Sequence, residues 1–215
     1  NRTAVIEGES GVTGSLEHYN IVPTVMILKR IRPNIKEILL ISEPSITGQA
    51  ILRDFKAQLS DPSVLSNANI EKLTEFVDVN FENLKRRLLA VNPDKVGVVF
   101  IAYYTYRDSS GRPVSYHDID QWVSDNTSFL DVGTADFNVK NGRLLSLASS
   151  GEELGFYVAN QLFKALQEEK DPNVFPIRRY IPLQLTFNQE KLVRLKIDLP
   201  YEIVSYAQAL SELNQ

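Results

Sequence analysis

The chain has 215 residues, of which 43% are hydrophobic and 23% charged, a composition typical of a folded globular protein with a core of ordinary size. Its net charge of −4 and pI of about 5.3 supply no basic field, which argues against a nucleic-acid partner. The absence of cysteine excludes disulfides, cysteine-ligated zinc and a thiol nucleophile.

Two short segments, 38–41 and 96–102, are almost continuously apolar. A strand with one face in water alternates apolar and polar residues, so these segments are predicted to be strands buried on both faces, as in a parallel sheet covered by helices. Between them, helices with one apolar stripe are predicted over 45–59 and 81–91, separated by a short strand over 75–79.

The same alternation extends to either side. A helix is predicted over 24–32, before the first apolar strand, and a helix over 116–124 followed by a strand over 128–132 comes after the second. Strands that alternate with helices form right-handed βαβ units. We therefore expect an α/β fold with a doubly wound parallel sheet, whose strands lie near 37–42, 74–79, 96–102 and 128–132.

After Gly133 the pattern changes. Residues 136–143 are polar and are predicted to form a loop, followed by a short strand over 144–148 and a long amphipathic helix over 151–167. Residues 181–187 are predicted to be extended, and Pro182 favours an edge position because proline cannot donate to a strand ladder. A last helix is predicted from Pro200 to about residue 213.

Candidate ligand-binding residues follow from the predicted sheet, because open α/β sheets bind ligands outside the carboxyl ends of their strands. Strand 38–41 is followed by Ser45, Thr47 and Gly48 at the start of a predicted helix. The free N–H groups of a helix start favour an anion. The alternative interpretation is that these hydroxyls only cap the helix.

Tyr103, Tyr104 and Thr105 follow the 96–102 strand. Tyrosine rings at this position could stack on the ring of a ligand and bond its edge. The alternative is that one or two of them simply cover the sheet. Asp131, in the predicted 128–132 strand, completes the set of candidate ligand-binding residues.

No constellation of residues predicts catalysis. His18 and His117 show no zinc-ligand spacing, and Ser115, His117 and Asp118 are too close in sequence to form a triad. The glycine-rich segment 8–15 lacks the lysine and spacing of a phosphate loop. We therefore expect a protein that is not an enzyme and that has no metal site or cofactor.

Three segments carry a resemblance to a known family: VPTVMILKRIRPNIKEILLISEPSITGQAILRDF, VGVVFIAYYTYRD and NGRLLSLASSGEELGFYVANQLFKALQ. The chain resembles the ABC-transporter substrate-binding family, a branch of the type I periplasmic binding proteins whose characterised members bind aromatic amino acids. The closing segment FPIRRYIPLQLTFNQEKLVRLKIDLPYEIVSYA is similar to the end of that family. The resemblance implies an extracytoplasmic domain that binds a small molecule, amino-acid-like or a carboxylate.

ITG after the first apolar strand and YRDSSGRPVSYHDIDQWVSDNTSF resemble variants found as sensor domains of membrane-bound histidine kinases and diguanylate cyclases. This second resemblance implies that the chain is the sensory input of a membrane-bound signalling protein. The alternative partner is a permease, with the chain as the solute-binding component of an ABC transporter. Alternatives of another class are a flavodoxin-like enzyme and an interaction domain without a ligand.

The resemblance also implies a division of the chain. Residues 1–14 would end the first lobe and cross over, residues 15–132 would form a complete ligand-binding lobe, and residues 133–215 would supply return segments that belong partly to the first lobe. The family has roughly a hundred further residues before this point, so we expect an incomplete first lobe. Apolar surface left exposed by that absence predicts a homodimer.

Overall fold

The computed structural model describes residues 14–16, 19–171, 178–179 and 183–212, and the side chains of 178–179, 206 and 208–212 are not described. The chain folds into two compact units. Unit 1 comprises residues 1–18 and 149–183, and unit 2 comprises residues 19–148 and 184–215. Each unit is discontinuous in sequence, and each is described below by itself.

Unit 2 is built on a six-stranded sheet in the order β3-β2-β4-β5-β6-β8. Its strands are β2 (Glu37–Ser42), β3 (Lys72–Val77), β4 (Val96–Phe100), β5 (Leu130–Gly133), β6 (Leu145–Ala148) and β8 (Gln184–Phe187). All neighbours pair in parallel except β8, which joins β6 antiparallel at the edge of the sheet. The predicted parallel order of the first four strands is confirmed, and so is the edge position of the extended segment. Pro182 itself lies outside the described residues.

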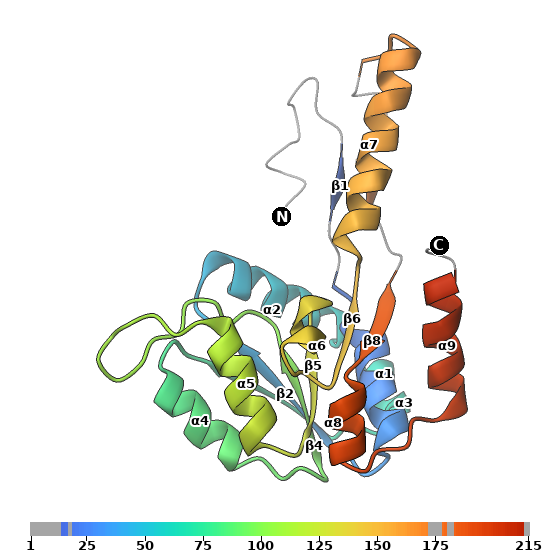
Figure 1. The fold of residues 1–215 in the computed structure, drawn as a ribbon. Helices are drawn as coiled ribbons and strands as arrows, with labels where there is room; N and C mark the ends of the chain where they lie inside the picture. The colour runs from blue at the N-terminus through green and yellow to red at the C-terminus, as the bar shows by residue number, and fades with distance from the viewer. Residues whose placement is uncertain (1–13, 17–18, 172–177, 180–182, 213–215) are drawn as a thin grey trace. The chain divides into compact units, whose positions relative to one another are not determined.

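Helices cover both faces of this sheet (Figure 1). They are α1 (Ile21–Ile31), α2 (Ile46–Gln58), α3 (Pro62–Asn67), α4 (Phe81–Leu89), α5 (Tyr116–Asn126), α6 (Phe137–Lys140), α8 (Gln189–Arg194) and α9 (Tyr201–Glu212). On one face Leu39, Ile41 and Phe100 pack with α4 and α5 in a buried core. On the other, Gly97 lets Leu28 of α1 approach the sheet, because a Cβ there would lie 3.0 Å from the Leu28 Cδ1 atom.

Three short helices differ from the sequence prediction. Residues 136–143 are not all loop, because α6 forms there after Asp136, whose side chain accepts a hydrogen bond from the backbone N–H of Phe137. α3 and α8 have six residues each, which is too short for an apolar stripe to be recognised as helical periodicity. Each begins at a capping side chain, Asp61 for α3 and Asn188 for α8.

Unit 1 contains the long helix α7 (Gly151–Gln167) and two short strands, β1 (Ser15–Leu16) and β7 (Arg178–Arg179), which pair in parallel. The side chain of Ser150 caps α7 by accepting a hydrogen bond from the N–H of Glu153. Within the described residues no helix is both long and apolar enough to cross a membrane. The predicted helix over 151–167 is confirmed, and the assignment of segments to two lobes remains a prediction.

Candidate functional site

The loops that follow β2, β4 and β5 meet at one edge of the unit 2 sheet, because these strands are neighbours and parallel. We call this edge the carboxyl edge. The Thr105 hydroxyl donates to a carboxylate oxygen of Glu43 over 3.0 Å, which joins the loops after β4 and β2. Similarly, the Thr134 hydroxyl donates to the carbonyl of Ile101 over 3.1 Å, joining the loops after β5 and β4. These two hydrogen bonds tie the three loops together.

Ser45, Thr47 and Gly48 lie at the start of α2. The Ser45 hydroxyl oxygen accepts a hydrogen bond from the Gly48 N–H over 3.0 Å, so Ser45 acts as the helix cap. Gly48 is held close to the preceding loop, since a Cβ at this position would lie 2.4 Å from the carbonyl oxygen of Glu43. Thr47 is exposed, so its hydroxyl is accessible at the edge.

Thr105 is held by a buried carboxylate. Both its N–H and its hydroxyl donate to Oε2 of Glu43, over 2.8 and 3.0 Å, and only 3% of Glu43 is exposed. The sequence prediction placed Thr105 among the candidate ligand-binding residues but did not anticipate its contact with Glu43. Because carboxylates repel one another at short range, this end of the edge is electrostatically unsuited to an anionic ligand group.

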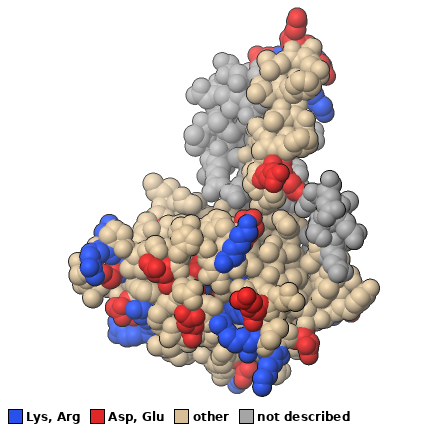
Figure 2. Space-filling model, viewed as in Figure 1, with Lys and Arg blue, Asp and Glu red and all other residues tan. Residues whose placement is uncertain are grey.

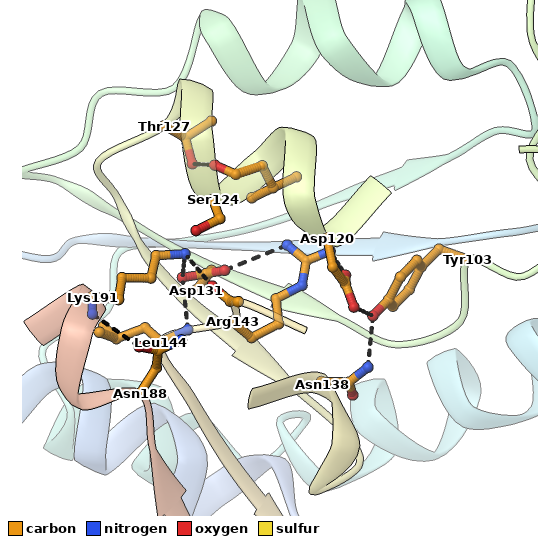
Figure 3. A network of polar contacts seen from close by, with 12 residues as sticks. Tyr103, Asp120, Ser124, Thr127, Asp131, Asn138, Arg143, Leu144, Asn188 and Lys191 are labelled. Atoms are coloured by element: carbon orange, nitrogen blue, oxygen red, sulfur yellow. Dashed lines mark hydrogen bonds and ion pairs between the residues drawn. The ribbon is translucent and has the colours of Figure 1, made fainter. Parts of the chain in front are cut away.

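Tyr103 is fully buried and covers the sheet, as one of the two interpretations of the tyrosines anticipated. Its hydroxyl donates to Asp120 over 3.1 Å and accepts a hydrogen bond from the Asn138 side-chain amide over 2.7 Å (Figure 3). Burial raises the pKa of Tyr103, so the phenol keeps its proton and remains a donor.

Tyr104 presents the aromatic surface of the edge. Its side chain is 46% exposed and stacks on Tyr103, with ring centroids 5.4 Å apart and an interplanar angle of 15°. Tyr116 meets Tyr104 edge-on at 5.7 Å, and Phe137 meets Tyr116 in the same way at 5.7 Å. These four rings form an aromatic cluster that has one buried end and one exposed side.

Asp131 lies inside the protein, away from the exposed part of the edge. Its carboxylate lies 2.7 Å from Nζ of Lys191 and 3.4 Å from the guanidinium of Arg143, and it accepts the N–H of Leu144 over 3.2 Å. The Asp131 and Arg143 side chains have no exposed surface, and that of Lys191 is 1% exposed. The structure therefore places Asp131 in internal contacts.

Arg143 connects this ion pair to the aromatic cluster. Its guanidinium lies 2.6 Å from Asp120 Oδ1 and 3.3 Å from the centroid of the Phe100 ring. Two buried cations thereby face two buried carboxylates, in a path from Lys191 to the Tyr103 hydroxyl (Figure 3). Burial lowers the pKa of Lys191 and raises that of Asp120, and the opposite charges resist both changes.

This buried network fixes the aromatic cluster from below. Tyr103 is held at its hydroxyl by Asp120 and Asn138, and Tyr104 rests on the Tyr103 ring. A ring held by hydrogen bonds and packing loses little freedom when a ligand stacks beside it, which favours binding. The described residues contain no group of three or more His, Asp or Glu side chains placed to hold a metal.

Sequence reasoning missed Glu43, Asp120, Arg143 and Lys191. One signal was available for the charged network: Asp131 stands within the apolar segment Phe129–Gly133, and a charge in a buried strand requires a partner. Nothing in the pattern identifies Arg143 as that partner. Ser115, which sequence analysis set aside as a triad member, caps α5 by accepting the N–H of Asp118 over 3.1 Å.

Comparison with known proteins identifies the fold. A scan against protein-family models finds no match, and a search of curated proteins finds none either. Solved structures do match. A conserved domain protein from Vibrio cholerae matches with a TM-score of 0.64 and 18% identity, and the match covers 90% of this chain and 61% of the other.

Two further structures are similar. An ABC domain from Streptococcus pneumoniae in complex with L-Trp matches with a TM-score of 0.64 and 15% identity over 90% of this chain and 62% of its own. A ligand-free, open substrate-binding protein with adhesive properties from Clostridium difficile matches with a TM-score of 0.62 and 17% identity, over 88% of this chain and 60% of its own. The chain thus spans about three-fifths of these proteins. The fold is that of the ABC solute-binding, periplasmic-binding-protein-like proteins.

Proposed function

We propose that this chain binds a small amino-acid-like molecule at the carboxyl edge of unit 2, as the sensory input of an extracytoplasmic, membrane-anchored signalling protein. The observation that carries the proposal is the aromatic surface of Tyr104, half-exposed at the edge where α/β sheets bind ligands and fixed from below by a buried network. The solute-binding fold supports the same function.

The charges of the edge favour a ligand with both an ammonium and a carboxylate. The Glu43 carboxylate beside Thr105 suits a positive group nearby. At the start of α2, Thr47 offers an exposed hydroxyl next to helix N–H groups, which suit a negative group. An amino acid with an apolar or aromatic side chain carries all three features, since that side chain can stack on Tyr104.

A ligand screen with matched variants tests the proposal. We expect a thermal-shift screen of the proteinogenic amino acids and short carboxylates to yield a stabilising ligand, because a ligand at 100 times its dissociation constant adds about 2.7 kcal/mol. In calorimetry with that ligand, Tyr104→Ala and Thr47→Val should each weaken binding about tenfold or more. Tyr201→Ala removes an 81% exposed tyrosine from α9 and should leave binding unchanged. Unchanged affinity in both edge variants would place the site elsewhere.

The runner-up is the solute-binding component of an ABC transporter, which uses the same site with a permease as partner. The two functions separate in the full-length protein. A membrane segment followed by a kinase or cyclase domain, whose activity responds to the ligand, supports the sensor. Ligand uptake that depends on a permease supports the transporter.

A further inference from the structure

Glu43 is a buried carboxylate without a cationic partner. Its Oε2 atom accepts both the N–H and the hydroxyl of Thr105, and only 3% of the residue is exposed. Among the described residues, no lysine, arginine or histidine forms an ion pair with this carboxylate. Asp120 and Asp131, which are also buried, each face a buried cation. Because a buried charge requires a partner, Glu43 lacks what the fold supplies to these two residues.

Glu43 and Thr105 together present hydrogen-bond acceptors. The second carboxylate oxygen, Oε1, accepts no hydrogen bond from the described residues, and it is not fully enclosed, so it retains some exposed surface. Thr105 is exposed beside it. Because a carboxylate oxygen only accepts, the Thr105 hydroxyl has to donate its proton to Glu43, and its remaining lone pairs can only accept. A ligand at this point therefore meets two acceptors, Glu43 Oε1 and Thr105 Oγ1, while both donors of Thr105 are already in use.

We infer that Glu43 and Thr105 select ligands that carry a primary ammonium group. An ammonium brings a positive charge for the carboxylate and several N–H donors for the two acceptors. A quaternary ammonium keeps the charge but has no N–H to donate, and an acid without nitrogen leaves the Glu43 carboxylate unpaired. The inference rests on the proposed function, since it concerns the same site, and it makes Glu43 the residue that determines specificity there.

The surface charge of unit 2 does not supply this selection. On the face that Figure 2 shows, Lys and Arg side chains are interspersed with Asp and Glu, so no field of one sign covers that face. A surface of mixed charge does not attract one kind of ligand from a distance. Ligands that differ only at one nitrogen are therefore distinguished by the groups that contact this nitrogen, which are Glu43 and Thr105.

Calorimetry of the 215-residue chain with L-phenylalanine, 3-phenylpropionate and N,N,N-trimethyl-L-phenylalanine tests the inference. The three probes share the ring and the carboxylate and differ only in the group that would meet Glu43. We expect both analogues to bind about tenfold to a hundredfold more weakly than L-phenylalanine, because each loses the hydrogen bonds to the charged carboxylate. Any other amino acid that the thermal-shift screen yields is compared with its own deaminated acid in the same way. An analogue that binds as tightly as its amino acid would overturn the inference.

Glu43→Gln assigns the selection to one residue. The amide oxygen of glutamine can still accept both donors of Thr105, while the amide nitrogen takes the place of Oε1. The dissociation constant of L-phenylalanine should rise about tenfold or more, and that of 3-phenylpropionate should not rise, so the ratio of the two constants falls. Glu82→Gln makes the same change on α4, where the side chain is 51% exposed, and should leave the ratio unchanged.

A matched pair of variants at Thr105 tests the second acceptor. Thr105→Ser keeps the hydroxyl and should keep the ratio, whereas Thr105→Val removes the hydroxyl and should lower it. Binding of L-phenylalanine with an unchanged ratio in both Glu43→Gln and Thr105→Val would overturn the inference and leave the proposed site in place. Failure of every amino acid in the screen to bind would overturn the proposed function as well.

Discussion

Arg143 shows how one residue can organise a protein that never exposes it. Its guanidinium faces Asp120 at 2.6 Å and Asp131 at 3.4 Å, with the Phe100 ring against its plane. Removing one partner of a buried ion pair leaves the other charge without compensation, which costs about 3–5 kcal/mol. Because Arg143 serves two carboxylates, its loss should also release Asp120 from its position beside the Tyr103 hydroxyl.

The first prediction therefore concerns Arg143→Met, which keeps much of the volume and removes the charge. We expect urea denaturation to give a free energy of unfolding lower by about 3–5 kcal/mol. The matched control is Arg112→Met, which breaks a 2.9 Å ion pair with Asp108 in which the Arg112 side chain is 80% exposed. That change should cost less than about 1 kcal/mol. Equal effects in the two variants would show that the buried network contributes no more than a surface pair.

At the scale of elements, β2 and β4 could be predicted because both faces of each strand are buried, which leaves an unbroken apolar run in the sequence. Long helices such as α4 and α7 could be predicted for a similar reason, since one apolar stripe repeats over several turns. The short helix α6 could not, because four residues carry no period. The contacts of the candidate site join segments far apart in sequence, such as Glu43 and Thr105, so no local pattern encodes them.

The junction between β5 and α6 leads to the second prediction. Gly133 ends β5 against Asn138, and a Cβ there would lie 2.4 Å from the Asn138 Cβ atom. Asn138 cannot move easily, because its side chain accepts the N–H of Ala135 and donates to Tyr103. Gly133→Ala should therefore lower the free energy of unfolding by about 1–3 kcal/mol.

Gly97→Ala, in the neighbouring strand β4, is the matched control. The nearest atoms to its Cβ would be methyl carbons, those of Leu28, Ile38 and Ile35 at 3.0, 3.3 and 3.5 Å. Side-chain ends can shift more easily than a bonded amide, so we expect a smaller loss of stability in urea denaturation. A larger loss in Gly97→Ala than in Gly133→Ala would contradict this account of the junction.

On the scale of the whole molecule, unit 2 completes its sheet from two distant parts of the chain. β6 leaves the sheet at Ala148 and β8 enters it at Gln184, and these two residues are paired across the antiparallel strands. Everything between them belongs to unit 1. β8 also precedes α8, which supplies Lys191 to the buried network, so the network depends on the return of the chain.

The pairing of Ala148 with Gln184 makes residues 149–183 an insertion at the tip of a β-hairpin. Two paired residues of an antiparallel hairpin can be closed by an Asn-Gly turn. A chain in which Asn-Gly joins residues 19–148 directly to residues 184–215 should therefore fold by itself, with one cooperative urea transition. A chain that ends at residue 148 lacks β8 and should not fold. A closed chain without a cooperative transition would contradict the prediction. A closed chain that folds would make unit 2 a self-contained scaffold that accepts other inserted segments at this turn.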